Sequence, residues 1–223
     1  MSTQAVIVAA GGGKRLQSNI PKPLISLHGK PLIVFSLECF DQSPLIKSII
    51  VVTQPIFMEE MKTLVQKYGI QKEVRFVVGG ETRKDSVYNG LEALDPATEY
   101  VVVHDAARPF LSREILEEAL RLCYAGQSVV VAVPVKPTIK RVKGASLEIV
   151  ETLDRSELWE AQTPQIFKKD VLIKAHRQAA AGVATDDAAL VEKLGLPVRI
   201  FPGEYRNIKI TTPEDVKIGE GLL

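Results

Sequence analysis

The chain has 223 residues, of which 46% are hydrophobic and 25% charged, so it is long enough to bury a globular core without a disulfide or a metal ion. Its 28 Lys and Arg residues balance 27 Asp and Glu residues, and the net charge of +1 argues against a dedicated nucleic-acid-binding protein. The two cysteines stand outside any CxxC pattern, and no apolar run reaches the ~20 residues of a membrane span, so we expect a reduced, cytoplasmic protein.

Short β-branched runs alternate with longer amphipathic stretches through the first 133 residues. Strands are predicted at residues 5–10, 48–53, 75–78, 100–104 and 129–133. Helices are predicted at residues 32–40, 57–68, 84–94 and 113–122. This alternation predicts a Rossmann-like α/β fold, with a mostly parallel sheet and helices on both of its faces. Ligands bind such sheets at the carboxyl ends of the strands.

Residues 136–155 break the alternation of strands and helices. Polar and apolar residues alternate there around Gly144-Ala145-Ser146, which predicts a protruding β-hairpin arm of two short strands. A charged two-stranded ribbon is marginally stable by itself in water, so the arm needs its own core or another subunit.

After the arm the chain returns to the α/β pattern. We expect helices at residues 168–181 and 186–194, a strand at 198–201 and a final helix that begins after Thr212. The whole chain, residues 1–223, is therefore expected to form a single domain that includes the arm.

A glycine-rich loop, Ala10-Gly11-Gly12-Gly13-Lys14-Arg15, follows the first predicted strand. Leu16 occupies the position of the third glycine of a dinucleotide-binding fingerprint, which disfavours a dehydrogenase. A Walker P-loop is excluded because Gly13-Lys14 is followed by Arg15 instead of Ser or Thr. The loop alone leaves two interpretations open, a phosphate cradle and a tight turn beside a solvated basic patch.

Further motifs follow the glycine loop, and together they resemble a known family. Pro21-Lys22 and His28-Gly29-Lys30-Pro31 resemble the signature of sugar-phosphate nucleotidyltransferases. The later motifs are GGETRKDSV at 79–87, VHDAARPF at 103–110, DR, LW and QTPQ within 154–165, TDD at 185–187 and NIKIT at 207–211. In this order and spacing they resemble the 2-C-methyl-D-erythritol 4-phosphate cytidylyltransferase family of the non-mevalonate isoprenoid pathway, over essentially the whole chain.

The resemblance implies transfer of CMP from CTP to 2-C-methyl-D-erythritol 4-phosphate, with release of pyrophosphate. The nucleophile would be a phosphate oxygen, which is largely dianionic at neutral pH because its second pKa is near ~6, so no general base is needed. The barrier is electrostatic, since each unit-charge pair at ~4 Å costs about 1 kcal/mol in water and more in a partly dry pocket. Cations and N–H donors must therefore surround the transferring phosphoryl group.

The resemblance also implies which residues form the site. Arg15 and Lys22 would stabilise the transition state, Lys209 would position the acceptor phosphate, and Arg155 would reach the partner's active site. The nucleotide-binding residues would be Ala9, Ala10, Gly11, Gly13, Gly80, Ser86, Asp105 and Ala106. The acceptor-binding residues would be Asp105, Arg108, Thr138, Arg155, Thr163, Thr185 and Lys209. Asp105 is also the candidate ligand of Mg²⁺, and the arm implies a homodimer.

Two alternatives remain open from the sequence. One is a cytidylyltransferase for another polyol phosphate, such as ribitol 5-phosphate, because that family shares most of these motifs. The other is a non-catalytic nucleotide-binding protein of the same fold, although binding alone does not need Arg15, Lys22 and Lys209 together.

Overall fold

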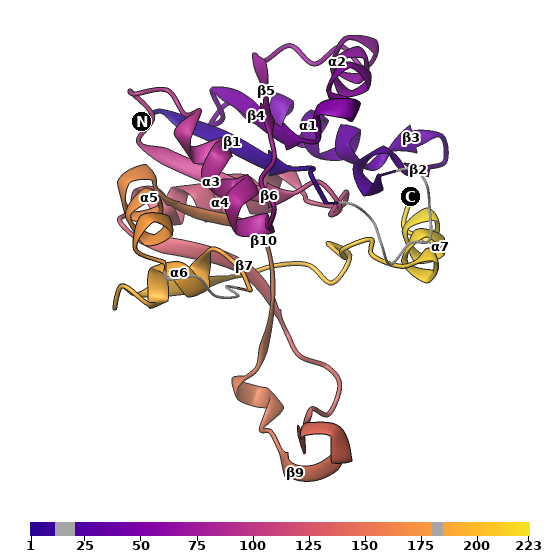
Figure 1. The fold of residues 1–223 in the computed structure, drawn as a ribbon, viewed down its shortest axis with the longest axis vertical. Coiled ribbons are helices and arrows are strands. Elements are labelled where there is room, and N and C mark those ends of the chain that lie inside the picture. Colours follow the sequence, from indigo (N-terminus) through magenta and orange to yellow (C-terminus); the bar gives the residue numbers. More distant parts are fainter. Residues whose placement is uncertain (12–20, 180–184) are drawn as a thin grey trace.

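The computed structural model describes residues 1–11, 21–179 and 185–223. In this part of the chain, seven strands form one sheet in the order β11-β7-β10-β6-β1-β4-β5 (Figure 1). The strands are β1 (Thr3–Val8), β4 (Ser48–Thr53), β5 (Val74–Val78), β6 (Tyr100–Asp105), β7 (Ser128–Pro134), β10 (Trp159–Lys168) and β11 (Val198–Pro202). Only β10 runs antiparallel to its neighbours in this sheet, β6 and β7, which confirms the predicted mostly parallel sheet.

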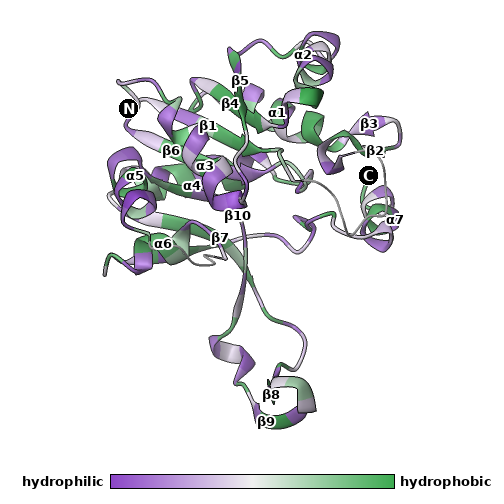
Figure 2. Cartoon of the chain, viewed as in Figure 1, coloured by the Kyte–Doolittle hydropathy of each residue, from purple (hydrophilic) through white to green (hydrophobic). Residues whose placement is uncertain are grey.

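Helices cover both faces of the sheet, as predicted. They are α1 (Leu32–Gln42), α2 (Met58–Lys67), α3 (Arg83–Glu92), α4 (Arg113–Tyr124), α5 (Lys169–Gln178), α6 (Ala188–Glu192) and α7 (Pro213–Gly221). Buried side chains of α1, α2 and α4 pack with Ala5 and Ile7 of β1, whereas those of α3, α5 and α6 pack with Val6 on the opposite face. This division follows from the two-residue period of a strand, and it explains why apolar residues follow one another along the second half of β1 (Figure 2).

A third, smaller apolar cluster joins three segments that are far apart in the sequence. Leu27 of β2 (Ser26–Leu27) and Leu32, the first residue of α1, pack with Phe110 and Ile210. Helix α7 lies beside β2 and β3 (Lys30–Pro31), and it begins at Thr212 with a capping box in which Thr212 and Asp215 bond reciprocally. None of the helices within the described ranges is long and apolar enough to cross a lipid bilayer.

Strand β10 was not predicted from the sequence. Its central residues are polar, it contains Pro164, and its pairing with β7 is irregular between Ala161 and Gln165. A polar stretch with a proline does not have the apolar alternation that predicts a strand. The structure nevertheless buries Gln162, Thr163 and Gln165, because their polar groups are hydrogen-bonded inside the protein.

The hairpin arm is present and projects away from the sheet (Figure 1). Strands β8 (Lys140–Lys143) and β9 (Glu148–Thr152) pair antiparallel, with a 3₁₀ turn at Gly144–Ser146 between them. Every residue of both strands is exposed, and four apolar side chains of the arm, Val142, Leu147, Ile149 and Val150, are 43–73% exposed. The arm therefore has no core of its own in a single chain.

Candidate active site

A cavity of about 400 Å³ lies at the carboxyl ends of β1 and β6. Several predicted residues line it, namely Ala10, Gly11, Lys22, Gly80, Ser86, Asp105 and Lys209. Lys22 begins a short 3₁₀ helix (Lys22–Leu24), and Lys209 comes from the extended segment before α7. Two cations far apart in the sequence thus face one hollow. Arg15 and Gly13 lie outside the described residues.

Two glycines after β5 bring the cavity wall close to Ala10. A Cβ atom on Gly79 would lie 2.4 Å from the Cβ of Ala10, and one on Gly80 would lie 2.4 Å from the Cβ of Asp85. Neither contact is sterically possible, so both positions need glycine. The N–H of Gly80 donates to the Ser86 hydroxyl at 3.1 Å, which ties this turn to α3. Gly79 belongs to the GGETRKDSV motif but was not predicted as a site residue.

The first turn of α3 forms the next part of the wall. Thr82 caps the helix and bonds reciprocally with Asp85, whose pKa is lowered mainly by the Thr82 hydroxyl. This cap fixes the turn that carries Arg83 and Ser86, and both residues line the cavity.

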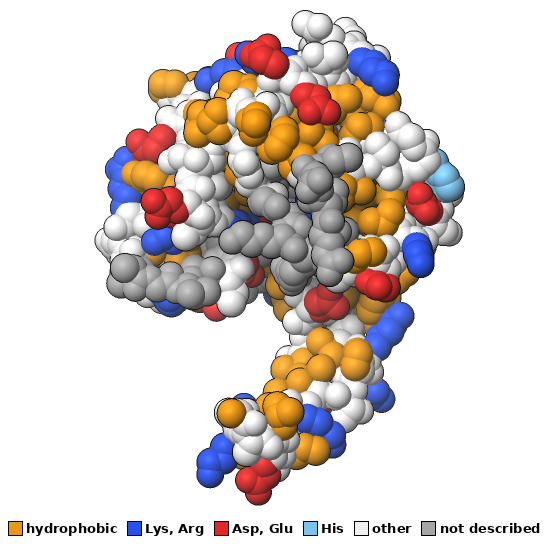
Figure 3. All heavy atoms as spheres, turned by 45° about the vertical axis from the view of Figure 1, so that its right-hand side comes forward, with side chains coloured by type: hydrophobic (Ala, Val, Ile, Leu, Met, Phe, Trp, Pro, Cys, Tyr) orange, Lys and Arg blue, Asp and Glu red, His pale blue; other side chains and the backbone are white. Residues whose placement is uncertain are grey.

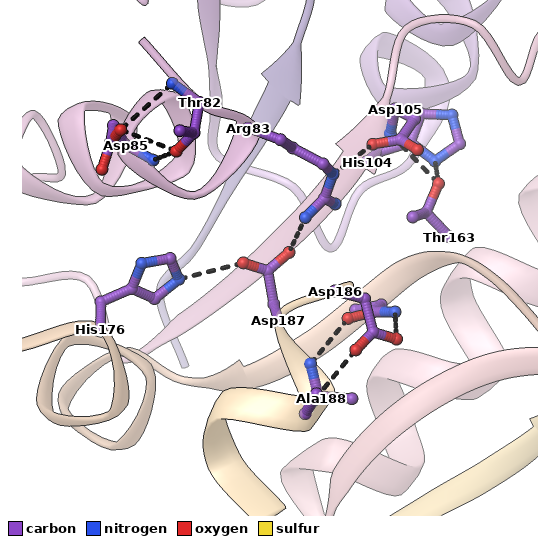
Figure 4. A network of polar contacts seen from close by, with 12 residues as sticks. Thr82, Arg83, Asp85, His104, Asp105, Thr163, His176, Asp186, Asp187 and Ala188 are labelled. Carbon is purple, nitrogen blue, oxygen red and sulfur yellow. Dashed lines mark hydrogen bonds and ion pairs between the residues drawn. The ribbon is translucent and has the colours of Figure 1, made fainter. Parts of the chain in front are cut away.

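Asp105, the last residue of β6, is the centre of a buried charge network (Figure 4). Its carboxylate accepts hydrogen bonds from Nε of Arg83 at 3.1 Å and from Nζ of Lys209 at 2.5 Å. Burial alone would raise the pKa of Asp105, but Arg83 and Lys209 outweigh burial and hold this pKa well below its usual range. Asp105 is therefore a carboxylate throughout the neutral pH range.

Arg83 links Asp105 to a second buried carboxylate. Its Nη1 donates to Oδ2 of Asp187 at 2.8 Å, and Oδ1 of Asp187 is 3.0 Å from Nε2 of His176. Burial would lower the pKa of Arg83, but Asp187 and Asp105 together raise it above its ordinary value. Arg83 was not predicted as a site residue, and its place within the GGETRKDSV motif is the feature of the sequence that marks it.

His104 and Thr163 fix the backbone of Asp105 from the opposite side. The Thr163 hydroxyl accepts the N–H of Asp105 at 3.1 Å and lies 2.9 Å from Nδ1 of His104, while Nε2 of His104 lies 3.1 Å from the carbonyl oxygen of Arg108. Because that carbonyl only accepts, His104 carries its proton on Nε2, and the hydroxyl donates to Nδ1. Complete burial lowers the pKa of His104 to about 4, so the ring is neutral.

A second, adjacent cavity of about 250 Å³ gathers the remaining acceptor candidates. Arg108, Thr163 and Thr185 line it, and it shares Arg83, Asp105 and Lys209 with the first cavity. Arg108 is 7% exposed, and its guanidinium donates hydrogen bonds to the carbonyl oxygens of Asn207 at 2.7 Å and Ala161 at 3.3 Å. The two hollows therefore meet at the Asp105–Lys209 ion pair.

Four of the predicted residues are not among the described residues that line either cavity. The N–H groups of Ala9 and Ala106 are used by neighbouring strands, donating to Val52 at 2.7 Å and Val8 at 3.1 Å. Thr138 and Arg155 are exposed at the base of the arm. Arg155 is oriented by one hydrogen bond, from Nη1 to the carbonyl oxygen of Lys136 at 3.0 Å.

The carboxylates of the cavity determine how a metal ion could be held. Among the described residues, no group of three or more His, Cys, Asp or Glu side chains is placed to hold one. A cage made of protein ligands alone is thus not present in this part of the chain. Asp105 can still supply one ligand, since a carboxylate has about four lone-pair sites and Arg83 and Lys209 occupy two of them. This arrangement fits Mg²⁺, which is usually bound by one or two carboxylates together with substrate phosphates.

The sheet, the glycine-lined cavity after β1 and the cations around Asp105 are the features of an α/β nucleotidyltransferase. The model of one family, 2-C-methyl-D-erythritol 4-phosphate cytidylyltransferase, matches residues 3–223. The chain belongs to this family.

Named relatives and solved structures agree with this assignment. A 2-C-methyl-D-erythritol 4-phosphate cytidylyltransferase of Caldanaerobacter subterraneus is 44% identical over 226 residues, covering 100% of this chain and 99% of the relative. The crystal structure of 4-diphosphocytidyl-2C-methyl-D-erythritol synthase from Anaerococcus prevotii has a TM-score of 0.89 at 31% identity, covering 99% of this chain and 95% of that chain. The Thermus thermophilus cytidylyltransferase has a TM-score of 0.79 at 31% identity, covering 100% and 98%.

Proposed function

We propose that this protein transfers CMP from CTP to 2-C-methyl-D-erythritol 4-phosphate, forming 4-CDP-2-C-methyl-D-erythritol and pyrophosphate. The observation that carries the proposal is the junction of two cavities at the Asp105–Lys209 pair. The first cavity, which is lined by Ala10, Gly11 and Lys22, takes the triphosphate. The second, with Arg108, Thr163 and Thr185, takes the polyol of the acceptor.

In this proposal, the residues where the two cavities meet position the phosphate groups and offset the repulsion between them. The acceptor phosphate is already largely dianionic at neutral pH, so the protein has to hold it in line with the α-phosphorus and offset the repulsion. Lys209 holds the acceptor phosphate, and its Asp105 partner fixes where its ammonium group points. Lys22, together with Arg15, stabilises the charge that develops on the transferring group and on the leaving pyrophosphate.

The enzyme's divalent cation is Mg²⁺ in this proposal, with Asp105 as its protein ligand. When bound, the ion neutralises part of the triphosphate charge. The low pKa of Asp105 supports this assignment because it keeps the carboxylate ionised in the neutral range. Removal of the divalent cation with EDTA is expected to stop turnover, and added Mg²⁺ is expected to restore it.

The arm joins two copies of the chain in a homodimer. Its exposed apolar side chains support this proposal (Figure 3), because an exposed two-stranded ribbon without a core needs a partner surface. Thr138 and Arg155 then complete the partner's acceptor site. Their exposure supports that role, as does the fact that neither is among the described residues that line the two cavities of their own chain.

The test of the activity is an incubation with CTP, Mg²⁺ and one acceptor, with pyrophosphate release as the readout. We expect release with 2-C-methyl-D-erythritol 4-phosphate and little with ribitol 5-phosphate. Turnover with ribitol 5-phosphate alone would replace the proposed acceptor. Binding of CTP without pyrophosphate release from any polyol phosphate would favour a non-catalytic nucleotide-binding protein.

A further inference from the structure

Asp187 and His176 form a buried polar pair behind the active site, and neither is among the described residues that line the two cavities. Their side chains are each 1% exposed. Burying an ionised carboxylate costs free energy unless charged or hydrogen-bonded partners compensate for it. The partners of Asp187 are His176 on one oxygen and Arg83 on the other (Figure 4).

This pair controls the orientation of the Arg83 guanidinium. Arg83 donates through Nε to Asp105 at 3.1 Å and through Nη1 to Asp187 at 2.8 Å. A guanidinium is planar and rigid, so two carboxylates held at two of its nitrogens determine both its position and its plane. Asp187 thus holds Nη1 of the Arg83 guanidinium, while Asp105 accepts a hydrogen bond from Nε of the same group.

The charges alternate along this chain of contacts, and the alternation affects Lys209. Asp187, Arg83, Asp105 and Lys209 are successively negative, positive, negative and positive. With Asp187 ionised, the Arg83 charge is shared between two carboxylates. Without that negative charge, Arg83 would be balanced by Asp105 alone and would compete with Lys209 for the same carboxylate.

His176 orients the Asp187 carboxylate. Its Nε2 faces Oδ1 of Asp187 at 3.0 Å, and its ring stacks on Tyr88 of α3 with 6.1 Å between centroids and 22° between the planes. The imidazole is therefore held on one side by the helix that also carries Arg83. This leaves Asp187 one defined orientation toward Arg83.

We infer that Asp187 and His176 are positioning residues of the transfer reaction, which act through Arg83 and Asp105 to set the place of the Lys209 ammonium group. The inference rests on the proposed function, since it assigns Lys209 to the acceptor phosphate. A purely structural role, in which the pair only fastens α5 and α6 to α3, would change stability without changing the kinetic constants of the folded enzyme.

The test compares kinetic constants of matched variants at a temperature where thermal unfolding shows each one to be folded. Asp187→Asn keeps the size of the side chain and removes its charge. We expect kcat to fall about 10- to 100-fold, the scale for a displaced reacting group. KM for the polyol phosphate should rise more than KM for CTP, because Lys209 serves the acceptor.

His176 is tested by a pair of variants. His176→Phe keeps the ring that stacks on Tyr88 and loses the N–H group, and it should lower kcat about fivefold. His176→Gln places an amide N–H near the position of Nε2 and should return kcat to within about twofold of the wild type. Adding His176→Phe to Asp187→Asn should lower kcat no further, because His176 acts through Asp187.

Glu92→Gln is the control, since it removes an exposed α3–α5 ion pair, Arg177 to Glu92 at 3.1 Å, that does not involve Arg83. Its kinetic constants should equal those of the wild type. The inference is overturned if Asp187→Asn keeps wild-type kcat and KM, if the two His176 variants are equally impaired, or if Glu92→Gln matches Asp187→Asn. An inactive wild-type enzyme would instead overturn the proposed function, so the two failures are distinguishable.

Discussion

The edge of the sheet and the arm hold their functional candidates in opposite ways. At the sheet edge, Asp105 is fixed by Arg83 and Lys209, and its backbone is held by the buried Thr163 and His104. On the arm, Arg155 is exposed and has one backbone hydrogen bond to Lys136. A buried network gives each charge one position within a single chain, whereas an exposed arginine needs a second surface to define its position. The comparison implies that this chain builds most of one site by itself and completes it with its partner.

The largest effect is expected from the sheet edge. Lys22→Ala should lower turnover about 10²- to 10³-fold, the range for removal of one preorganised charge stabiliser. Steady-state pyrophosphate release measures it. Lys62→Ala is a suitable control, because Lys62 forms an exposed i,i+3 pair with Glu59 on α2. If Lys22→Ala lost CTP affinity while turnover at saturation was intact, Lys22 would serve ground-state binding.

The arm's dependence on a partner can be tested by complementation. Arg155→Ala should reduce turnover by about 10²-fold, because the partner's site loses one cation. Co-expressed Arg155→Ala and Lys22→Ala chains should regain about a quarter of the wild-type activity, since half of the dimers would be mixed and each would contain one intact site. Activity equal to the mean of the two single variants would show that the arm completes its own chain's site.

A pH dependence of stability is expected from His104 at the sheet edge. Its pKa is about 4 in the folded protein and about 6.5 when unfolded, so the unfolded chain binds more protons between these values. The free energy of unfolding should therefore fall as the pH falls from 6.5 to 4, by about 3 kcal/mol in all.

Urea unfolding at several pH values measures this effect, with His104→Gln as the reference. Gln keeps an N–H donor for the Arg108 carbonyl oxygen and does not titrate. The folded-state pKa values of Asp105 and Asp187 are lowered, so the stability they contribute is lost mainly below about pH 4, outside the window of His104. Equal slopes for both proteins between pH 6.5 and 4 would contradict the neutral, buried assignment.

The smallest effects are expected at the two capping boxes, where comparison of two variants distinguishes a loss of stability from a loss of function. Thr82→Ala on α3 and Thr212→Ala on α7 should each cost about 1 kcal/mol of stability. Only Thr82→Ala should also raise KM for CTP, because its cap fixes the turn that carries Ser86 and Arg83. An unchanged KM in both variants would show that this turn needs no cap to bind the nucleotide.

The sequence predicted most strands and helices of the fold, but it predicted the contacts within the site less completely. Buried strands such as β4 are continuous β-branched runs, and their prediction is confirmed at residues 48–53. Strand β10 was missed because its polar residues are buried by hydrogen bonds that depend on distant segments. Those bonds cannot be recognised from local periodicity.

The site residues divide in the same way, into those that a motif marks and those that only the packing of distant segments brings together. A motif in the sequence marks Lys22, Asp105 and Lys209, and the fold places all three around one cavity. Asp187 is marked in the sequence only as part of the TDD motif, and no motif contains His176. Their connection to Arg83 depends on how α5 and the start of α6 pack against α3, which no spacing along the chain encodes.

The segment that carries Lys209 is held in place partly by α7, and this has a consequence for biosynthesis. The same segment is held by Arg108, which donates to Asn207, and by Ile210, whose N–H donates to Ala107 at 2.8 Å. Ile210 and α7 then pack on the Leu27 cluster near the start of the chain. A chain without α7 would keep these two hydrogen bonds but lose the packing of α7 on the Leu27 cluster, so Lys209 should be held less firmly until α7 has left the ribosome and folded. A premature stop at residue 213 should accordingly lower transferase activity and stability, which pyrophosphate release and thermal unfolding would measure.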